Sequence, residues 1–134
     1  MMKSNRAVGN SFEQELCELL FLNGFWSHNL KQDHSGQPAD IIAVRNRCAH
    51  LIDCKNCEGD KFDLRRIEEN QITAMDLWQE CGNGCGWFAI KIKDEIRMIA
   101  KQAILDFAKH CNSIASEVIR EYSLSFETWV KVCR

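Results

Sequence analysis

Two short apolar runs, separated by a three-residue polar segment, constrain the fold of this chain more than any other feature. The runs at 41–44 and 49–52 contain several β-branched residues, and the segment 45–47 has the composition of a turn, so together they predict a β-hairpin. If the turn is symmetric about the bond between its last two residues, Asp40 lies directly opposite Asp53. Facing residues share one face of a sheet, with Cβ atoms about 5 Å apart. The hairpin therefore predicts two neighbouring carboxylates.

A lysine joins these two carboxylates. Because side chains alternate along a strand, Lys55 shares the face of Asp53 while Cys54 points away. Two like charges repel on a partly buried sheet, and a bound cation resolves the conflict. Oxygen ligands select hard ions, so we expect Mg²⁺, with Mn²⁺ as a substitute. Such an ion polarises a phosphoryl oxygen and activates water, and Lys55 can orient that water or stabilise the phosphate charge, which predicts phosphodiester hydrolysis.

Length and composition are those of one globular domain. A chain of 134 residues buries enough surface for a core without disulfides or metal, and its 46% hydrophobic and 27% charged residues are ordinary. No apolar run is long enough to span a bilayer, so no membrane partner is expected. The first residues lack the apolar segment of a signal peptide. We therefore expect a cytoplasmic protein whose eight cysteines are reduced thiols.

The net charge of −2 does not by itself indicate nucleic-acid binding, but the distribution of charge is uneven. Basic residues are concentrated in the first half of the chain, where they predict a basic rim around an acidic metal centre. The residues expected to contact DNA are Arg6, Arg45, Arg47, Lys61, Arg65 and Arg66. Each of them can equally be an ordinary solvated charge, and the sequence leaves both interpretations open.

The first predicted helix covers 11–23, where apolar residues recur at helical spacing. Asn10 or Ser11 is the expected N-cap, and Gly24 ends the helix. Glu13 falls at the edge of the apolar stripe, so it is the acid of this helix that faces inward. It either joins the metal site or reaches back to Asn10 as a capping-box glutamate.

The second predicted helix covers 63–80 and ends at Gly82. Gln71 falls within its buried stripe, where an amide must find hydrogen-bond partners. It either bonds to an active-site group or metal-bound water, or it bonds to a backbone group of the core.

The remaining elements complete an α/β fold around one mixed sheet. Strands are expected at 25–30, 86–92 and 95–99, the last two joined by a tight turn, and C-terminal helices at 102–108, 113–120 and 125–130. The order of helix, three strands, helix, two strands and further helices predicts an α/β sandwich, and the length of the chain predicts a single domain. Its core is expected at about 9–100, followed by a helical extension at about 101–134.

The hairpin motif resembles that of the PD-(D/E)XK nuclease superfamily and, within it, the Holliday-junction resolvases. Pro38-Ala39-Asp40 is similar to the PD half, and Asp53-Cys54-Lys55 is similar to the (D/E)XK half. Ala39 stands between the proline and the aspartate, and Asp53 stands where glutamate is more frequent. The resemblance runs over about 9–99.

Both flanking helices add to this resemblance. Residues 9–16 look like the resolvase helix that starts with glycine and carries a metal-site glutamate, a role that falls on Glu13. Residues 66–71 look like the helix in which related nucleases keep a glutamine near the scissile phosphate, here Gln71.

The resemblance implies a restriction-endonuclease-like core and a metal-dependent DNA endonuclease. The implied catalytic residues are Glu13, Asp40, Asp53, Lys55 and Gln71, and the implied metal ligands are Glu13, Asp40, Asp53 and the backbone carbonyl of Cys54. It also implies branched or duplex DNA as substrate and a homodimer, because two symmetric incisions suit a four-way junction. Small proteins of this kind are frequent in phages and mobile elements, so such a source is expected.

Two other functions remain open from the sequence. The same fold could serve a restriction or repair nuclease that acts on duplex or single-stranded DNA. A different class is a zinc or iron-sulfur module, because the cysteines at positions 54 and 57, and those at 81 and 85, form two pairs at ligand-like spacing.

Overall fold

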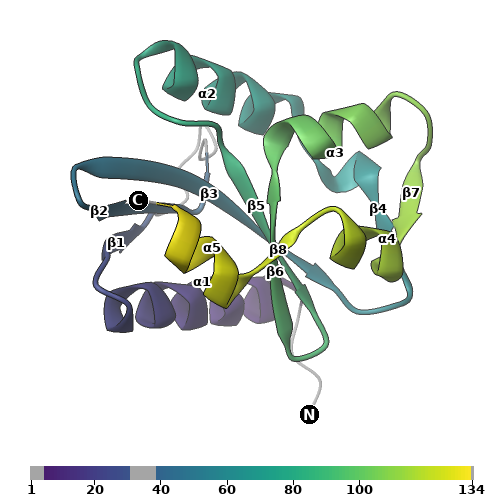
Figure 1. Cartoon of the computed structure of the whole chain (residues 1–134). Coiled ribbons are helices and arrows are strands. Elements are labelled where there is room, and N and C mark those ends of the chain that lie inside the picture. Colours follow the sequence, from purple (N-terminus) through teal and green to yellow (C-terminus); the bar gives the residue numbers. More distant parts are fainter. Residues whose placement is uncertain (1–4, 31–38, 134) are drawn as a thin grey trace.

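The fold is a six-stranded sheet with helices on both faces (Figure 1). The computed structural model describes residues 5–30 and 39–133, with side chains from Ser11 onward. The strand order is β1-β2-β3-β5-β6-β8. These strands are β1 (Trp26–Asn29), β2 (Ile41–Arg45), β3 (Cys48–Cys57), β5 (Trp87–Ile92), β6 (Glu95–Ala100) and β8 (Leu124–Ser125). All neighbours are antiparallel except β3 and β5, so the predicted mixed sheet is confirmed.

Two hydrophobic clusters lie on opposite faces of this sheet. Helices α1 (Asn5–Leu22) and α5 (Phe126–Val132) cover one face, where Leu16 and Trp129 are completely buried. Helices α2 (Glu69–Glu80), α3 (Lys101–Ala108) and α4 (Ser116–Glu121) cover the other, around Met75 and Ile104. Figure 1 shows α1 below the sheet and both α2 and α3 above it. The β-strand alternation of apolar residues supplies both clusters.

The central hairpin has the predicted register. Ile41 faces Ile52 and Arg45 faces Cys48, as symmetry about the turn requires. Asn46 and Arg47 have φ values of 54° and 68°, the left-handed conformation that both central residues of a type I′ turn adopt. This turn matches the right-handed twist of its strands and fixes the register of the whole hairpin.

The first helix differs from its prediction at its start. It begins at Asn5, so neither Asn10 nor Ser11 is its N-cap and the capping-box interpretation of Glu13 is wrong. Helix formers before Ser11 extend the helix, since an interior glycine costs only about 1 kcal/mol. Its end is as predicted, because Gly24 takes a φ of 86°, which a side chain would disfavour.

The second helix is shorter than predicted. It starts at Glu69, and the preceding residues form β4 (Lys61–Asp63) and the 3₁₀ turn η1 (Leu64–Arg66). Asp63 caps this turn by accepting from the Arg65 amide at 2.9 Å. Strand β4 pairs with β7 (Ser113–Ala115) from the far end of the chain. That long-range pairing, which local propensity does not reveal, delays the helix.

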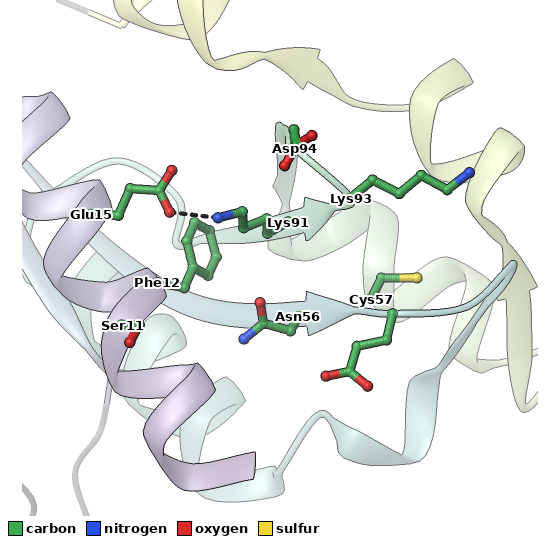
Figure 2. A pocket seen from close by; sticks show the side chains of 9 residues that line it. Ser11, Phe12, Glu15, Asn56, Cys57, Lys91, Lys93 and Asp94 are labelled. Carbon is green, nitrogen blue, oxygen red and sulfur yellow. Dashed lines mark hydrogen bonds and ion pairs between the residues drawn. The ribbon is translucent and has the colours of Figure 1, made fainter. Parts of the chain in front are cut away.

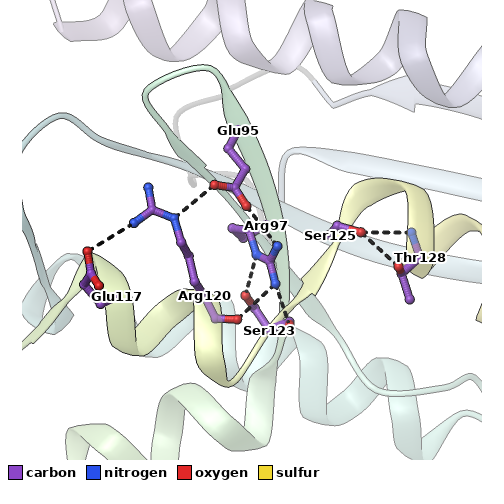
Figure 3. A network of polar contacts seen from close by, with 7 residues as sticks. All are labelled: Glu95, Arg97, Glu117, Arg120, Ser123, Ser125 and Thr128. Carbon is purple, nitrogen blue, oxygen red and sulfur yellow. Dashed lines mark hydrogen bonds and ion pairs between the residues drawn. The ribbon is translucent and has the colours of Figure 1, made fainter.

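The C-terminal third is part of the fold and is not purely helical. β7 and β8 interrupt the predicted helices, β8 extends the main sheet, and Trp129 is completely buried. Figure 3 shows how this region is held: Arg97 of β6 donates to the Ser123 hydroxyl and to the carbonyls of Arg120 and Ser123. In the part of the chain that the structure describes, no helix is long and apolar enough to cross a membrane.

Candidate active site

The open end of the β2–β3 hairpin brings Asp40 and Asp53 together. The Asp40 amide donates to the Ile52 carbonyl at 3.1 Å, which continues the ladder one residue beyond β2. Asp40 is 7% exposed and Asp53 is 1% exposed. The Oδ2 atom of Asp40 accepts a hydrogen bond from the Cys54 amide at 2.7 Å. The backbone of β3 therefore orients one carboxylate while β3 itself carries the other.

Two side chains hold the Asp53 carboxylate. Gln71 of α2 donates its amide to Oδ1 at 2.9 Å, and the Lys55 ammonium lies 3.2 Å from Oδ2. That ion pair lacks hydrogen-bond geometry, so Oδ2 accepts no hydrogen bond from any described residue. Gln71 also accepts from the Glu68 amide at 3.1 Å in a capping box. Gln71 thus bonds to the predicted site residue Asp53, and its backbone contact is with the exposed N-cap of its own helix rather than with the core.

Glu13 reaches the same place from α1. Burial raises the pKa of Glu13 from 4.5 to about 7, and the charge of Asp40 and a hydrogen bond to it add to the rise. A hydrogen bond from Asn29 and the charge of Lys55 oppose it. Asn29, in β1, had no signal in the sequence beyond being a polar residue on an edge strand. Glu13, Asp40 and Asn29 therefore meet where α1, β1 and β2 converge.

An ion pair sets α1 against the sheet. Figure 2 shows Glu15 of α1 and Lys91 of β5 pointing toward each other, and the Lys91 ammonium lies 2.6 Å from Glu15 Oε2. They line a pocket of about 370 Å³ that also includes Ser11 and Asn56, the residue after Lys55. The contact ties α1, the helix that carries Glu13, to the central strand β5.

The electrostatics of this site are unbalanced. Burial first, and then the charge of Asp40, raise the pKa of Asp53 well above its usual value, while Lys55 lowers it. Three carboxyl groups thus share one ammonium group. Without a further cation, the folded protein favours protonation of some of these groups at neutral pH.

The residues present fit a hard divalent cation. In residues 11–30 and 39–133, no three His, Cys, Asp or Glu side chains form a complete metal cage. Mg²⁺, however, commonly uses one or two carboxylates and keeps several waters. Among the described residues, Asp53 Oδ2 accepts no well-aligned hydrogen bond, although the Lys55 ammonium lies 3.2 Å away, and Asp40 lies beside Asp53. The Cys54 amide points toward Asp40, and both backbone polar groups of a strand residue point to one side, so its carbonyl faces this site too.

The basic residues of the predicted rim have different positions. Arg45 is held inside the fold: its guanidinium donates to the carbonyls of Asn23, Val130 and Cys133 and lies over the Phe25 ring. Arg47 is in the hairpin turn, at the opposite end of the hairpin from Asp53. The Arg6 side chain and Pro38 lie outside what the structure describes.

The other three cations lie on the segment that follows β3. Lys61, Arg65 and Arg66 are exposed. Arg66 donates to the carbonyl of Asn56, which places its guanidinium beside the strand just after Lys55. Arg65 pairs with Asp63. Of the three, Arg66 is the one that a contact places beside the site, and the charges of the segment are offset by Glu58, Asp60 and Asp63.

The cysteine pairs do not assemble a metal centre. Cys54 packs with the cluster under α1, whereas Cys57 is buried in the cluster on the opposite face. Cys81 is exposed at the end of α2, and Cys85 is half-buried before β5. All eight cysteines are free thiols. The geometry gives no support to the zinc or iron-sulfur interpretation.

Comparisons with known proteins agree with the fold and with the resemblance. The solved structure of Hjc from Archaeoglobus fulgidus, a Holliday junction resolvase, is 16% identical, has a TM-score of 0.68, and the match covers 92% of this chain and 95% of that one. A bacterial homing endonuclease is 12% identical with a TM-score of 0.62, covering 98% and 92%. No curated protein matches the chain. The model of the archaeal Holliday junction resolvase (hjc) family matches residues 4–134, and the chain therefore belongs to this family of nucleases.

Proposed function

We propose that this protein is a metal-dependent endonuclease that hydrolyses phosphodiester bonds in four-way DNA junctions. The observation that carries the proposal is the open end of the hairpin, where Asp40 and Asp53 are buried side by side with Lys55 and Gln71 on the second carboxylate. Such an arrangement is costly for stability and useful for binding a cation and a phosphate. Membership of a resolvase family supports a junction as the substrate.

The metal ligands in this proposal are Asp40, Asp53 and the Cys54 carbonyl, with Glu13 joining directly or through water. Mg²⁺, or Mn²⁺ in its place, would polarise a phosphoryl oxygen and lower the pKa of water when bound. Asp40 is oriented by the Cys54 amide, and Asp53 is oriented by Gln71 through Oδ1. These contacts leave Asp53 Oδ2 directed toward Lys55 and available as a ligand.

Lys55 supplies the positive charge of the site. Its ammonium is anchored by Asp53 and is largely buried, so it can stay in one position as a phosphate approaches. A fixed cation stabilises charge that grows on the phosphate in the transition state, and it can also orient the attacking water by hydrogen bonding. Gln71 acts next to it by holding Asp53, so loss of either side chain should slow cleavage.

We further propose that Lys61, Arg65 and Arg66 contact the DNA backbone near the site, with Arg6 on the side of α1. Cations on the surface next to buried carboxylates would guide a polyanion to a centre that is itself acidic. Arg45 has no such role in this proposal, since carbonyl groups already accept from both of its terminal nitrogens. A homodimer would present two sites to a two-fold symmetric junction. A phage or mobile-element source stays a prediction.

Cleavage of three substrates tests the function. Purified protein with Mg²⁺ is incubated with a four-way junction, a flap and a linear duplex, and wild type is compared with Asp53→Ala and Lys55→Ala. We expect junction cutting that requires Mg²⁺ and is lost in both variants. Asp106→Ala, which removes an exposed carboxylate of α3, is the matched control and should cut like wild type.

Each outcome decides between the candidates. Cutting without metal, or full activity in Asp53→Ala, would show that the site lies elsewhere. Equal cutting of duplex and junction would favour a restriction or repair nuclease with the same centre. Absence of cutting on all three substrates, with metal bound, would contradict the endonuclease proposal itself.

A further inference from the structure

Helix α2 contributes Gln71 to the site, and three contacts on one side of this helix set its rotation. Gln71 bonds to Asp53, Met75 packs against the sheet, and Asp76 pairs with Lys101 of α3. At about 100° per residue, Met75 and Asp76 lie roughly 40° and 140° around the helix from Gln71. The apolar contact is therefore flanked by one polar contact on each side. Figure 1 shows α2 and α3 on the same side of the sheet.

The contact of Met75 requires α2 to come very close to Gly86. Met75 is completely buried, and a Cβ atom placed on Gly86 would lie 2.7 Å from Met75 Cβ and closer still to its outer atoms. Only glycine lets α2 come this near to the strand end before β5. The Gly86 carbonyl also accepts from the Lys101 amide at 3.0 Å. One residue thus joins α2 to the first turn of α3.

The contact between Asp76 and Lys101 involves a buried charge. Lys101 is 7% exposed, and its ammonium donates to Asp76 Oδ1, while Asp76 itself is about half exposed. A buried ammonium needs a partner, yet such a pair adds little net stability compared with an apolar residue of the same size. The pair instead determines which side of α2 faces α3, because Asp76 must point toward Lys101. When Asp76 faces α3, the helical spacing turns Gln71 toward Asp53.

We propose that Lys101 is a positioning residue for DNA cleavage: acting through Asp76, it fixes the rotation of α2 that brings the Gln71 amide to Asp53. This inference rests on the proposed function of the Asp53 site. Lys101 touches neither Asp53 nor Lys55, and it works only through α2. Met75 sets how closely α2 approaches the sheet, and the pair of Asp76 with Lys101 adds a directional contact that limits rotation about the axis of α2.

The first test compares variants of the two partners. Lys101→Met keeps the length and burial of the side chain, and Asp76→Asn keeps its shape, so both should fold. We expect the single-turnover cleavage rate to fall about tenfold in each, because a displacement on the order of 1 Å can cost up to roughly 100-fold. The dissociation constant for the junction should stay the same. Lys101→Arg should retain most of the rate, since it keeps the charge.

A matched control comes from the far end of α3, the helix that carries Lys101. Lys109, the C-cap of α3, forms an exposed pair at 3.8 Å with Asp106 of that helix, and in the described part of the chain no hydrogen bond or ion pair joins either residue to α2. Lys109→Met should therefore cleave like wild type. An equal loss of rate in Lys109→Met, or an unchanged rate in Lys101→Met, would overturn the positioning role.

A double variant separates positioning from general stability. If Lys101 acts through Gln71, then adding Lys101→Met to Gln71→Ala should slow cleavage no further. Two residues that act independently would instead give additive losses. Additive losses in the double variant would therefore contradict the inference.

A measurement without DNA keeps this inference distinct from the proposed function. In metal-free protein, the side-chain amide signals of Gln71 in a ¹⁵N correlation spectrum report its bond to Asp53. We expect them to shift in Lys101→Met and to stay in place in Lys109→Met. If wild type cuts no DNA, the function fails while this measurement still decides the inference: unmoved Gln71 signals in Lys101→Met would overturn it.

Discussion

The two ends of the β2–β3 hairpin both bury charge, and they differ in how that charge is partnered. At the turn end, the Arg45 guanidinium donates to three carbonyl groups and lies 4.2 Å above the Phe25 ring centre. At the open end, Asp40, Asp53 and Glu13 lie near the ammonium of Lys55, the cation that residues 11–30 and 39–133 supply there. Both terminal nitrogens of Arg45 have acceptors, although its Nε has none among the described residues, so the turn end is the better balanced in hydrogen bonds and the open end is the acidic one.

The balanced end holds the fold together. Two of the Arg45 acceptors, Val130 and Cys133, belong to the C-terminal helix or follow it, and the third, Asn23, follows α1. One side chain of the sheet thus ties down the ends of both helices on that face. The neighbouring His50 is buried against Trp129, and burial and the Arg45 charge lower its pKa, which favours the neutral form.

At the acidic end, carboxyl groups lie close together, and folding alone does not relieve the repulsion between them. Buried like charges cost free energy, and a protein under selection for stability alone would replace them. Their presence at a polar site with an oriented lysine is what a catalytic centre requires. The comparison predicts that variants at the open end lose activity while keeping stability, and that variants at the turn end do the reverse.

The largest effect is expected for Asp53→Asn. It removes a charged group of the proposed metal site, so we expect cleavage of a four-way junction to fall on the order of 1000-fold, as when a key electrostatic group is lost. The free energy of unfolding of the metal-free protein should not fall at pH 8, because the substitution removes the repulsion between Asp53 and Asp40 together with the pair to Lys55. Urea titration and single-turnover cleavage on the same sample check both halves.

A stability loss in Asp53→Asn would break the comparison. It would mean that Asp53 contributes to folding through Lys55 and Gln71 as Arg45 does through its carbonyl groups. Lys93→Met, in the exposed turn after β5, controls for the removal of a surface charge and should leave both quantities unchanged.

The second largest effect is expected at the turn end. Arg45→Met leaves three carbonyl groups without their donor, and we expect the free energy of unfolding to fall by about 3 kcal/mol. Cleavage by the folded fraction should stay within about twofold of wild type, because the open end is untouched. Urea midpoints and rates measured well below the unfolding temperature would test this. A large rate loss in fully folded protein would show that the two ends are coupled.

Much of the candidate site could be predicted because its geometry is local. The turn at 45–47 and the alternation of β2 and β3 fix a register, and that register alone places Asp40, Asp53 and Lys55 together. Gln71 stood out because an amide inside an apolar stripe needs a partner, and the structure supplies one in Asp53. Patterns within about twenty residues of each other were enough for these predictions.

What the sequence did not reveal depends on distant partners. Arg45 lies in a segment with the composition of a surface turn, but two of its acceptors are 85 and 88 residues away in the sequence. Its position inside the fold therefore cannot be deduced locally. The same holds for β4, which pairs with β7, and for the late start of α2. The role of Asn29 beside Glu13 depends on how α1 crosses the sheet, which sequence periodicity does not specify.

A smaller effect concerns pH. The folded protein raises the pKa of Glu13 from 4.5 to about 7 and also raises that of Asp53, so it favours the protonated forms. The resulting stability is fully present below about pH 4.5 and is lost as the pH rises through about 7. Since Glu13 is only half-buried, solvent screening limits its part to about 1 kcal/mol.

Urea midpoints of metal-free protein at several pH values measure this loss. Glu13→Gln should flatten the decline, and Mg²⁺ should stabilise wild type more at pH 8 than at pH 6, because protons compete with the ion for the carboxylates. Stability that rises from pH 5 to pH 8 without metal would mean that the open end is as well balanced as the turn end.

The smallest expected effect separates the two ends in DNA binding. Arg66 donates to the Asn56 carbonyl beside the open end, whereas Arg47 lies six residues from Asp53 along β3, about 20 Å away for an extended strand. We expect Arg66→Ala to reduce the salt dependence of junction binding by about one counterion, and Arg47→Ala to leave it unchanged. Fluorescence anisotropy with a labelled junction at several salt concentrations measures both slopes. Equal reductions would place DNA along the whole hairpin, and the turn end would then serve binding as well as folding.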